Sequence, residues 1–244
     1  MENSKAHIIA QLQREILPLQ GFKSPGSKAA CVDLGVINDV FPDNRFPTGV
    51  IHEFISTDRE GVSSSAGFIA GILGMLMKDG GVVLWISSAP LLFPPTLSYF
   101  GIHPSKVIVV NVPKEKDLLW ATEEALKCEG LAAVLVEMRE LDFTASRRLQ
   151  LIVERSGVTG FILRQNPRKL GTTAAVTRWK ITSLSSIVVE AGMPGVGFPC
   201  WKVELQKVRN GKPGCWELQW QGKKFEVIEQ HEEIVVNDQK RKVG

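Results

Sequence analysis

Cysteine is scarce in this sequence: the 244 residues include four, and no two are spaced as Cys-x-x-Cys. Disulfide-rich secreted domains and common zinc sites need more cysteines at closer and more regular spacing. We therefore expect no disulfide framework, no metal site and a reducing, cytoplasmic environment. The four are Cys31, Cys128, Cys200 and Cys215.

Long hydrophobic runs are also absent. No apolar run reaches the ~20 residues that cross a bilayer. The longest candidate, residues 66–77, is rich in glycine and is predicted to be a buried helix. The first residues, Met-Glu-Asn-Ser-Lys, are polar and do not resemble the apolar core of a signal peptide. These absences argue against a membrane protein and against secretion.

The overall composition is that of an ordinary globular protein, with 44% hydrophobic and 23% charged residues and a net charge of +3. The distribution of charged residues along the chain is more informative than the net charge. Between Arg139 and Lys180 there are nine basic and three acidic side chains. Such a cluster can hold a phosphate backbone, or it can be a solvated basic face. The sequence leaves both interpretations open.

The N-terminal region, residues 1–30, is predicted to be a helix followed by a linker. Apolar side chains recur at helical spacing over residues 5–17, and a Gly-, Ser- and Pro-rich stretch follows at residues 20–28. The helix either packs on its own domain or projects to a partner. Its apolar candidates for partner contact are Ile8, Ile9, Leu12 and Ile16.

An alternation of apolar strands and helical patterns begins at Gly49. Strands that are apolar throughout, separated by helices, indicate a mostly parallel sheet covered on both faces. The predicted strands are residues 49–56, 81–87, 106–112, 131–136 and 160–165. The predicted helices are residues 65–77, 91–101, 115–128 and 144–156.

Beyond Thr173 the pattern changes to alternating apolar and polar residues, which is typical of antiparallel strands. These strands are predicted at residues 175–184, 201–208, 215–221 and 223–228, with a hairpin connection at residues 209–214. We therefore expect an α/β fold in which antiparallel strands extend a parallel sheet. The predicted core domain is residues 31–230, and residues 231–244 form a polar, flexible tail.

The connection after the first strand, residues 56–67, has the setting of a phosphate-binding loop without its chemistry. Such a loop needs backbone amides, a lysine for the terminal phosphates and a Ser or Thr for magnesium. Here no lysine occurs between Lys28 and Lys78, and two carboxylates lie where a triphosphate would. The sequence predicts a degenerate nucleotide loop made of Asp58, Arg59, Glu60, Gly61, Ser63, Ser64 and Ser65.

The order of segments resembles the RecA-type recombinase core from about Gly49 to Trp220. Four motifs narrow the resemblance further: DLLWATEEAL at residues 117–126, RRLQL at 147–151, TRW at 177–179 and VRNGKPG at 208–214. In these motifs the chain is similar to the ImuA family, the RecA-like and SulA-like proteins of bacterial mutagenesis cassettes.

The resemblance implies a RecA-like core that has lost its catalytic groups. The water-activating glutamate would fall at Ala89, and the Walker B aspartate would fall at Glu137, a longer carboxylate. Without the lysine and the general base, two separate contributions to catalysis are missing. We expect no ATPase activity and no cofactor. The open alternative is an ATPase in which Arg59 and Ser63 to Ser65 stand in for the usual groups.

By the same resemblance, residues 165–173 correspond to a shortened DNA-contacting loop. Possible phosphate contacts are Arg164, Arg168, Lys169, Thr172, Thr173 and Arg178. The alternative is that the loop merely joins two strands. In the C-terminal strands, Trp201, Trp216 and Trp220 are candidate partner-binding aromatics, or they pack on a helix.

The function that the resemblance implies is that of a non-catalytic adaptor in SOS-induced translesion synthesis. Its expected partners are RecA, an ImuB-like Y-family protein and an error-prone C-family DNA polymerase, with DNA as a further possible ligand. A third hypothesis, from the SulA-like description, is a cell-division inhibitor.

Overall fold

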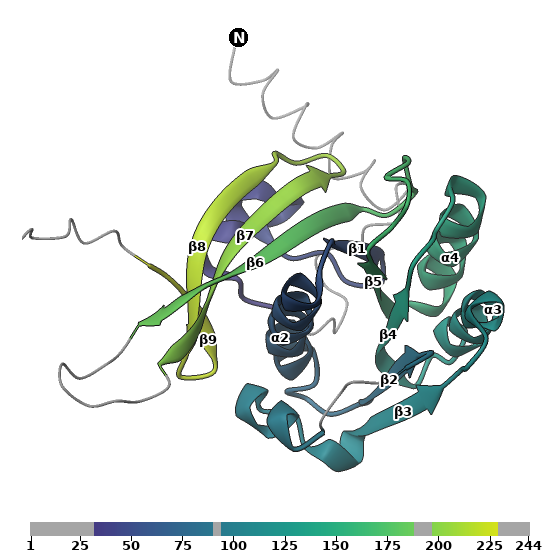
Figure 1. Cartoon of the computed structure of the whole chain (residues 1–244), viewed down its shortest axis with the longest axis horizontal. Coiled ribbons are helices and arrows are strands. Elements are labelled where there is room, and N and C mark those ends of the chain that lie inside the picture. Colours follow the sequence, from purple (N-terminus) through teal and green to yellow (C-terminus); the bar gives the residue numbers. More distant parts are fainter. Residues whose placement is uncertain (1–31, 90–93, 188–196, 229–244) are drawn as a thin grey trace, which may run out of the picture.

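A computed structural model describes residues 32–89, 94–187 and 197–228. These residues form one nine-stranded sheet in the order β3-β2-β4-β5-β1-β6-β7-β8-β9 (Figure 1). The predicted N-terminal helix, with Ile8, Ile9, Leu12 and Ile16, and the predicted tail lie outside the described residues.

The parallel half of the sheet has the strands that the apolar runs predict. They are β1 (Ile51–Ser56), β2 (Val82–Ser87), β3 (Val107–Asn111), β4 (Leu131–Met138) and β5 (Thr159–Gln165). All pair in parallel, and β1 is buried at every position. A strand that is apolar on both faces is stable only where both faces are covered. The predicted parallel core is confirmed.

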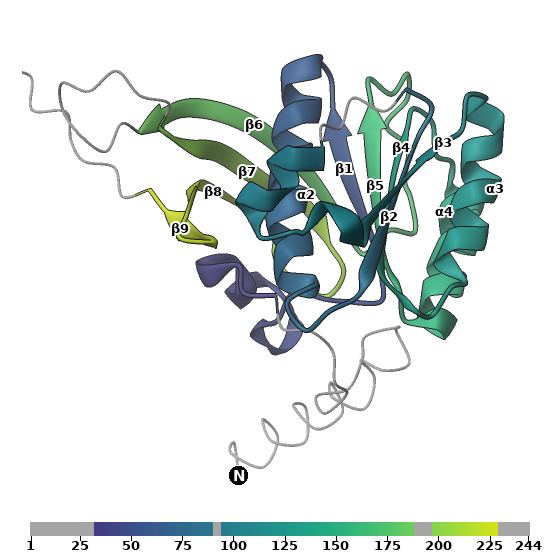
Figure 2. The ribbon, with the colours of Figure 1, turned by 90° about the horizontal axis from the view of Figure 1, so that it is seen from below.

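Helices cover the two faces of these strands unequally. α2 (Arg59–Leu76) packs on one face, and α3 (Glu115–Leu126) and α4 (Phe143–Ser156) pack on the other (Figure 2). α4 buries one apolar stripe that includes Leu149 and Val153, whereas α2 is buried at every position from Phe68 to Leu73. No described helix is long and apolar enough to span a membrane.

The antiparallel half continues the same sheet through β6 (Thr177–Ile187), β7 (Phe198–Val208), β8 (Gly214–Gln221) and β9 (Lys224–Val227). β6 still runs parallel to β1, and the strands after it pair antiparallel. This confirms the mixed α/β sheet with an antiparallel C-terminal extension.

The face of this extension that meets α2 is aromatic, which corrects one prediction. Trp201 and Trp220 are 4% and 2% exposed, and both rings pack against Phe225. Trp216 is half-buried against the same core. Buried rings cannot anchor a partner, so Trp201 and Trp220 belong to the core that joins α2 to the sheet.

Short 3-10 turns fill the remaining connections. The helix predicted at residues 91–101 is a 3-10 segment, η3 (Pro94–Phe100), and another short turn, η4 (Pro104–Lys106), precedes β3. Two further 3-10 turns, η1 (Gly35–Val40) and η2 (Pro42–Asn44), come before β1 and are not apparent from the sequence. Prolines occupy the first positions of η3 and η4, where a helix needs no amide donor.

Candidate functional site

The junction between β1 and α2 is much shorter than the sequence predicts. β1 ends at Ser56 and α2 begins at Arg59, so Thr57 and Asp58 alone connect them. A phosphate-binding loop wraps a longer glycine-rich segment around the anion. The predicted degenerate loop is therefore corrected: Arg59, Glu60, Gly61, Ser63, Ser64 and Ser65 lie in the first two turns of α2.

Asp58 caps the N-terminus of α2, the place where the sequence resemblance leads us to expect a phosphate. Its Oδ1 accepts a hydrogen bond of 2.7 Å from the backbone amide of Gly61, and its Oδ2 accepts one of 3.2 Å from Thr57. The Gly61 amide, and then the Thr57 hydroxyl, lower the pKa of this carboxyl. The positive end of the helix dipole thus already holds an anion that belongs to the protein.

The serines that might hold magnesium are engaged by the fold. The hydroxyls of Ser63 and Ser64 donate to the backbone carbonyls of Arg59 and Glu60, at 3.1 and 2.9 Å. Ser65 is fully buried and shares a hydrogen bond of 3.0 Å with Ser56. Serine in a helix commonly bonds back to the preceding turn.

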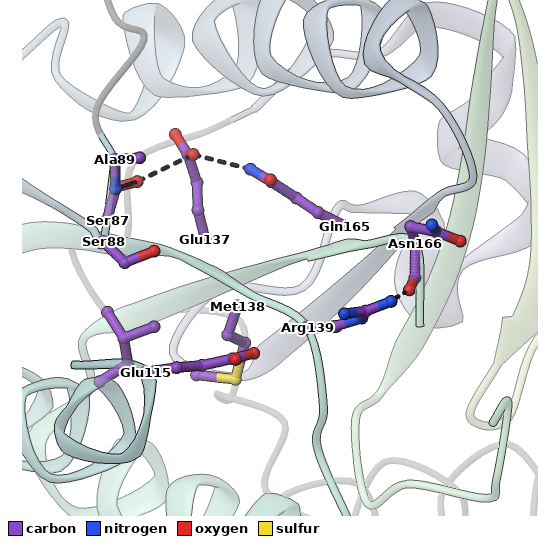
Figure 3. A pocket seen from close by; sticks show the side chains of 10 residues that line it. Ser87, Ser88, Ala89, Glu115, Glu137, Met138, Arg139, Gln165 and Asn166 are labelled. Carbon is purple, nitrogen blue, oxygen red and sulfur yellow. Dashed lines mark hydrogen bonds between the residues drawn. The ribbon is translucent and has the colours of Figure 1, made fainter. Parts of the chain in front are cut away.

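The side chain of Glu137, at the Walker B-like position, accepts hydrogen bonds from three neighbouring side chains. Its Oε1 accepts from the indole of Trp85 at 2.6 Å. Its Oε2 accepts from Ser87 at 3.0 Å and from Gln165 at 2.7 Å (Figure 3). Three donors on a side chain that is 8% exposed satisfy the carboxylate without a cation. In this arrangement Glu137 ties β2, β4 and β5 together.

A polar cavity of about 350 Å³ lies beside Glu137, at the carboxyl ends of these strands. Ala89, at the expected position of the general base, lines it with a methyl group, which cannot accept a proton. Arg139 also lines it, and its Nε donates to the carbonyl of Asn166 at 3.1 Å (Figure 3). Among the described residues no three His, Cys, Asp or Glu side chains gather as metal ligands would.

Glu53 organises a buried charge cluster that the sequence analysis missed. This carboxylate is fully buried in β1, and it pairs with Arg164 at 2.9 Å and with Arg178 at 2.8 Å. Thr173 donates a third hydrogen bond, at 2.8 Å. A carboxylate inside an otherwise apolar strand pattern is the signal that could have predicted it, because a buried charge requires partners.

The same arginines hold the shortened loop, residues 166–176, against the sheet. Arg164 donates to the carbonyls of Arg139 and Lys169, at 3.3 and 3.0 Å, and Arg178 donates to that of Gly171 at 2.6 Å. Lys207 donates to the carbonyl of Thr173 at 2.7 Å, and burial, followed by the charge of Arg178, lowers its pKa.

These contacts correct part of the predicted DNA surface. Arg164 and Thr173 are 1% and 3% exposed and bond inward, so neither reaches a phosphate from this position. Arg178 is committed to Glu53 and Gly171. The other candidates, Arg168, Lys169 and Thr172, are exposed on the outside of the loop. The structure therefore separates residues that order the loop from residues that solvent reaches.

Comparison with known proteins identifies the family. No protein-family model matches the chain. The chain is similar to Protein ImuA from two strains of Caulobacter vibrioides, each 34% identical over 201 residues, which cover 76% of this chain and 80% of the relative. The motifs at residues 117–126 and 147–151 lie in α3 and α4. The chain belongs to the ImuA family.

Proposed function

We propose that this protein is a non-catalytic accessory protein of error-prone DNA repair, working in the cytoplasm through the partners of an ImuA-type mutagenesis cassette. Membership of the ImuA family supports the association with such a cassette. The absence of catalysis is supported by Asp58, whose carboxylate holds the helix amide that a nucleotide phosphate would need.

Two further features support the absence of nucleotide hydrolysis. The two-residue connection between β1 and α2 leaves no loop to surround a phosphate. Glu137 has its hydrogen bonds satisfied by the protein, and Ala89 offers no base. Enzymes that transfer phosphoryl groups depend mostly on positioning the phosphate and stabilising its charge. In this protein Asp58 and Glu137 are instead hydrogen-bonded to other groups of the fold.

The nucleotide proposal is tested by calorimetry with magnesium and ATP on the full chain. We expect no binding at micromolar nucleotide and no phosphate release. Asp58→Ser is the matched variant, because serine retains the cap and removes the negative charge. Micromolar affinity in the unmodified protein, lost in Arg59→Ala, would overturn the proposal in favour of an ATPase with an unusual loop.

The bridging role is tested with purified partners. We propose that the protein joins RecA, an ImuB-like Y-family protein and an error-prone C-family polymerase. Pairwise pull-downs should show this chain binding at least two of them. Co-sedimentation of those two should increase when this chain is added. Binding to none of them, with capture of the tubulin-like division protein instead, would contradict the proposal and favour a division inhibitor.

A further inference from the structure

The two edges of the described sheet differ in how they are protected. β9 forms one edge, and it carries Lys224 and Glu226, which pair at 2.7 Å. β3 forms the other, and its sequence, Val-Ile-Val-Val-Asn, has no charge and no proline. Natural sheets usually protect an edge with charges, proline or a bulge, because unpaired backbone groups bind other strands. β3 has none of these within its five residues.

The outer side of β3 presents a regular row of backbone donors and acceptors. The amide of Val112 points inward and donates to the carbonyl of Ser87 in β2. Backbone direction alternates along a strand, so Ile108 and Val110 also face β2. Val107, Val109 and Asn111 therefore direct their N–H and C=O groups away from the sheet. Among the described residues no strand pairs with them.

This row is complementary to itself. Two copies of β3 can be paired antiparallel with Val109 at the centre. Val109 of one copy then lies opposite Val109 of the other, and Val107 of each copy lies opposite Asn111 of the other. All of these residues face outward, as a hydrogen-bonded antiparallel pair requires. A register shifted by one residue would oppose an outward-facing residue to an inward-facing one. We propose that β3 pairs with β3 of a second copy, so that two nine-stranded sheets join into one.

The side chains suit this register. Ile108 and Val109 are 49% and 39% exposed, which is unusual for the middle of an apolar strand in a parallel sheet. In the paired arrangement Ile108 lies opposite Val110, and Val109 lies opposite Val109 of the second copy. Pairs of β-branched residues stabilise adjacent strands. Lys106, just before the strand, falls opposite Val112 and meets no like charge directly.

The pairing is two-fold symmetric and closed, so it produces dimers and not fibres. A single short edge buries less than the roughly 1,600 Å² of a standard interface. We therefore expect a dimer that dissociates on dilution. This inference is independent of the proposed function, because neither the nucleotide junction nor the loop at residues 166–176 contributes to it.

Sedimentation velocity of the full chain over a concentration series tests the pairing. We expect a monomer–dimer equilibrium with dissociation in the micromolar range. Val109→Lys should weaken it at least tenfold, because two lysines would then lie opposite each other on the symmetry axis. Val109→Glu should do the same. An equal mixture of the two variants should restore the dimer, because lysine then faces glutamate.

Val227→Lys is the matched control, since Val227 is 43% exposed on the charged edge strand β9. Its sedimentation should equal that of the unmodified protein, and circular dichroism should show all variants folded. A monomer at every concentration up to about 100 μM overturns the proposal. A dimer that persists in Val109→Lys, or that the mixture fails to restore, overturns it equally.

Discussion

At the scale of single residues, the protein places several charged and polar groups inside the fold and satisfies each of them. Glu53 has two arginines and a threonine, and Glu137 has three donors. Among the described residues no buried side-chain nitrogen or oxygen lacks a hydrogen-bond partner. Glu53 and Glu137 thus link neighbouring strands through their hydrogen bonds.

The first prediction concerns Glu53→Gln. Glutamine fills the same space but leaves the charges of Arg164 and Arg178 without their carboxylate. We expect the free energy of unfolding to fall by about 3–5 kcal/mol, as for other broken buried pairs. Urea denaturation measures it. Glu204→Gln is the control, because Glu204 pairs with Lys180 at the surface, at 3.8 Å, and should cost less than about 1 kcal/mol. Equal losses would contradict the prediction.

His52 is a second buried group whose environment fixes its charge. Its ring lies between Phe46 and Phe161, with centroids 4.4 and 5.3 Å away. Its Nε2 bonds to the carbonyl of Pro47 at 2.9 Å, and its Nδ1 bonds to Thr177 at 2.7 Å. Because the carbonyl can only accept, Nε2 carries the hydrogen and Nδ1 accepts from the hydroxyl. Burial lowers the pKa of His52 from 6.5 to about 3, so the folded protein holds it neutral.

A pH dependence of stability follows from His52. Below its unfolded pKa of 6.5 the unfolded chain binds a proton that the folded chain does not. The stability is therefore complete above that pH and falls as the pH decreases toward the folded pKa, by up to about 1.4 kcal/mol per pH unit. His52→Gln cannot titrate, so its unfolding free energy should fall less steeply between about pH 6.5 and 4.5. Parallel curves for the two proteins in urea denaturation would refute this.

At the scale of elements, helix α2 is fitted closely to its neighbours by glycine. A Cβ at Gly71 would lie 2.6 Å from the ring of Phe225, and a Cβ at Gly74 would lie 2.1 Å from the carbonyl oxygen of Phe100. Glycine costs a helix about 1 kcal/mol relative to alanine. The close approach of α2 to η3 and to β9 explains why glycine is present.

Gly74→Ala should therefore destabilise the protein although alanine favours helix. The added methyl group meets a backbone oxygen, which cannot rotate away as a side chain can. We expect a net loss of about 1–3 kcal/mol in the free energy of unfolding, as for overpacked cores. Ser63→Ala, on the exposed side of the same helix, should change it by less than about 1 kcal/mol. A stabilised Gly74→Ala variant would show that α2 can move away from η3.

At the scale of the whole molecule, the parallel and antiparallel parts share one core. A single cluster of buried residues includes Phe54 of β1, Trp179 of β6 and Phe225 of β9. The rings of Phe54 and Trp179 stack with their centroids 6.0 Å apart, and Phe68 of α2 contacts both Trp179 and Phe225. A core shared in this way makes the C-terminal strands part of the same cooperative unit.

We therefore predict a single unfolding transition. Far-UV circular dichroism and tryptophan fluorescence should give the same midpoint in urea, the usual test of two-state unfolding. Phe225→Ala should lower both midpoints together, because it removes a buried ring worth about 3–5 kcal/mol. Val227→Ala, in the same strand but exposed, should lower them little. An early fluorescence transition would mean that the C-terminal strands unfold separately.

The sequence by itself determined most of the helices and strands, the direction of most strands and the missing phosphate lysine, but it did not show the 3-10 turns η1 and η2 or the start of α2 at Arg59. The periodicity of apolar residues indicates which faces of the helices and strands are buried. The absence of a lysine is read directly from the sequence. Trp85 and Trp179 fall within predicted strands, and the structure buries both, at 2% and 0% exposed.

Only the tertiary structure decided what the charged residues do. Arg178 looked like a phosphate contact until β6 placed it beside Glu53, 125 positions earlier in the chain. Asp58 looked like a residue of a long loop until the helix was seen to begin immediately after it. The direction of a side chain, and the partner that satisfies its charge, depend on strands that are distant in sequence, and local patterns carry no information about them.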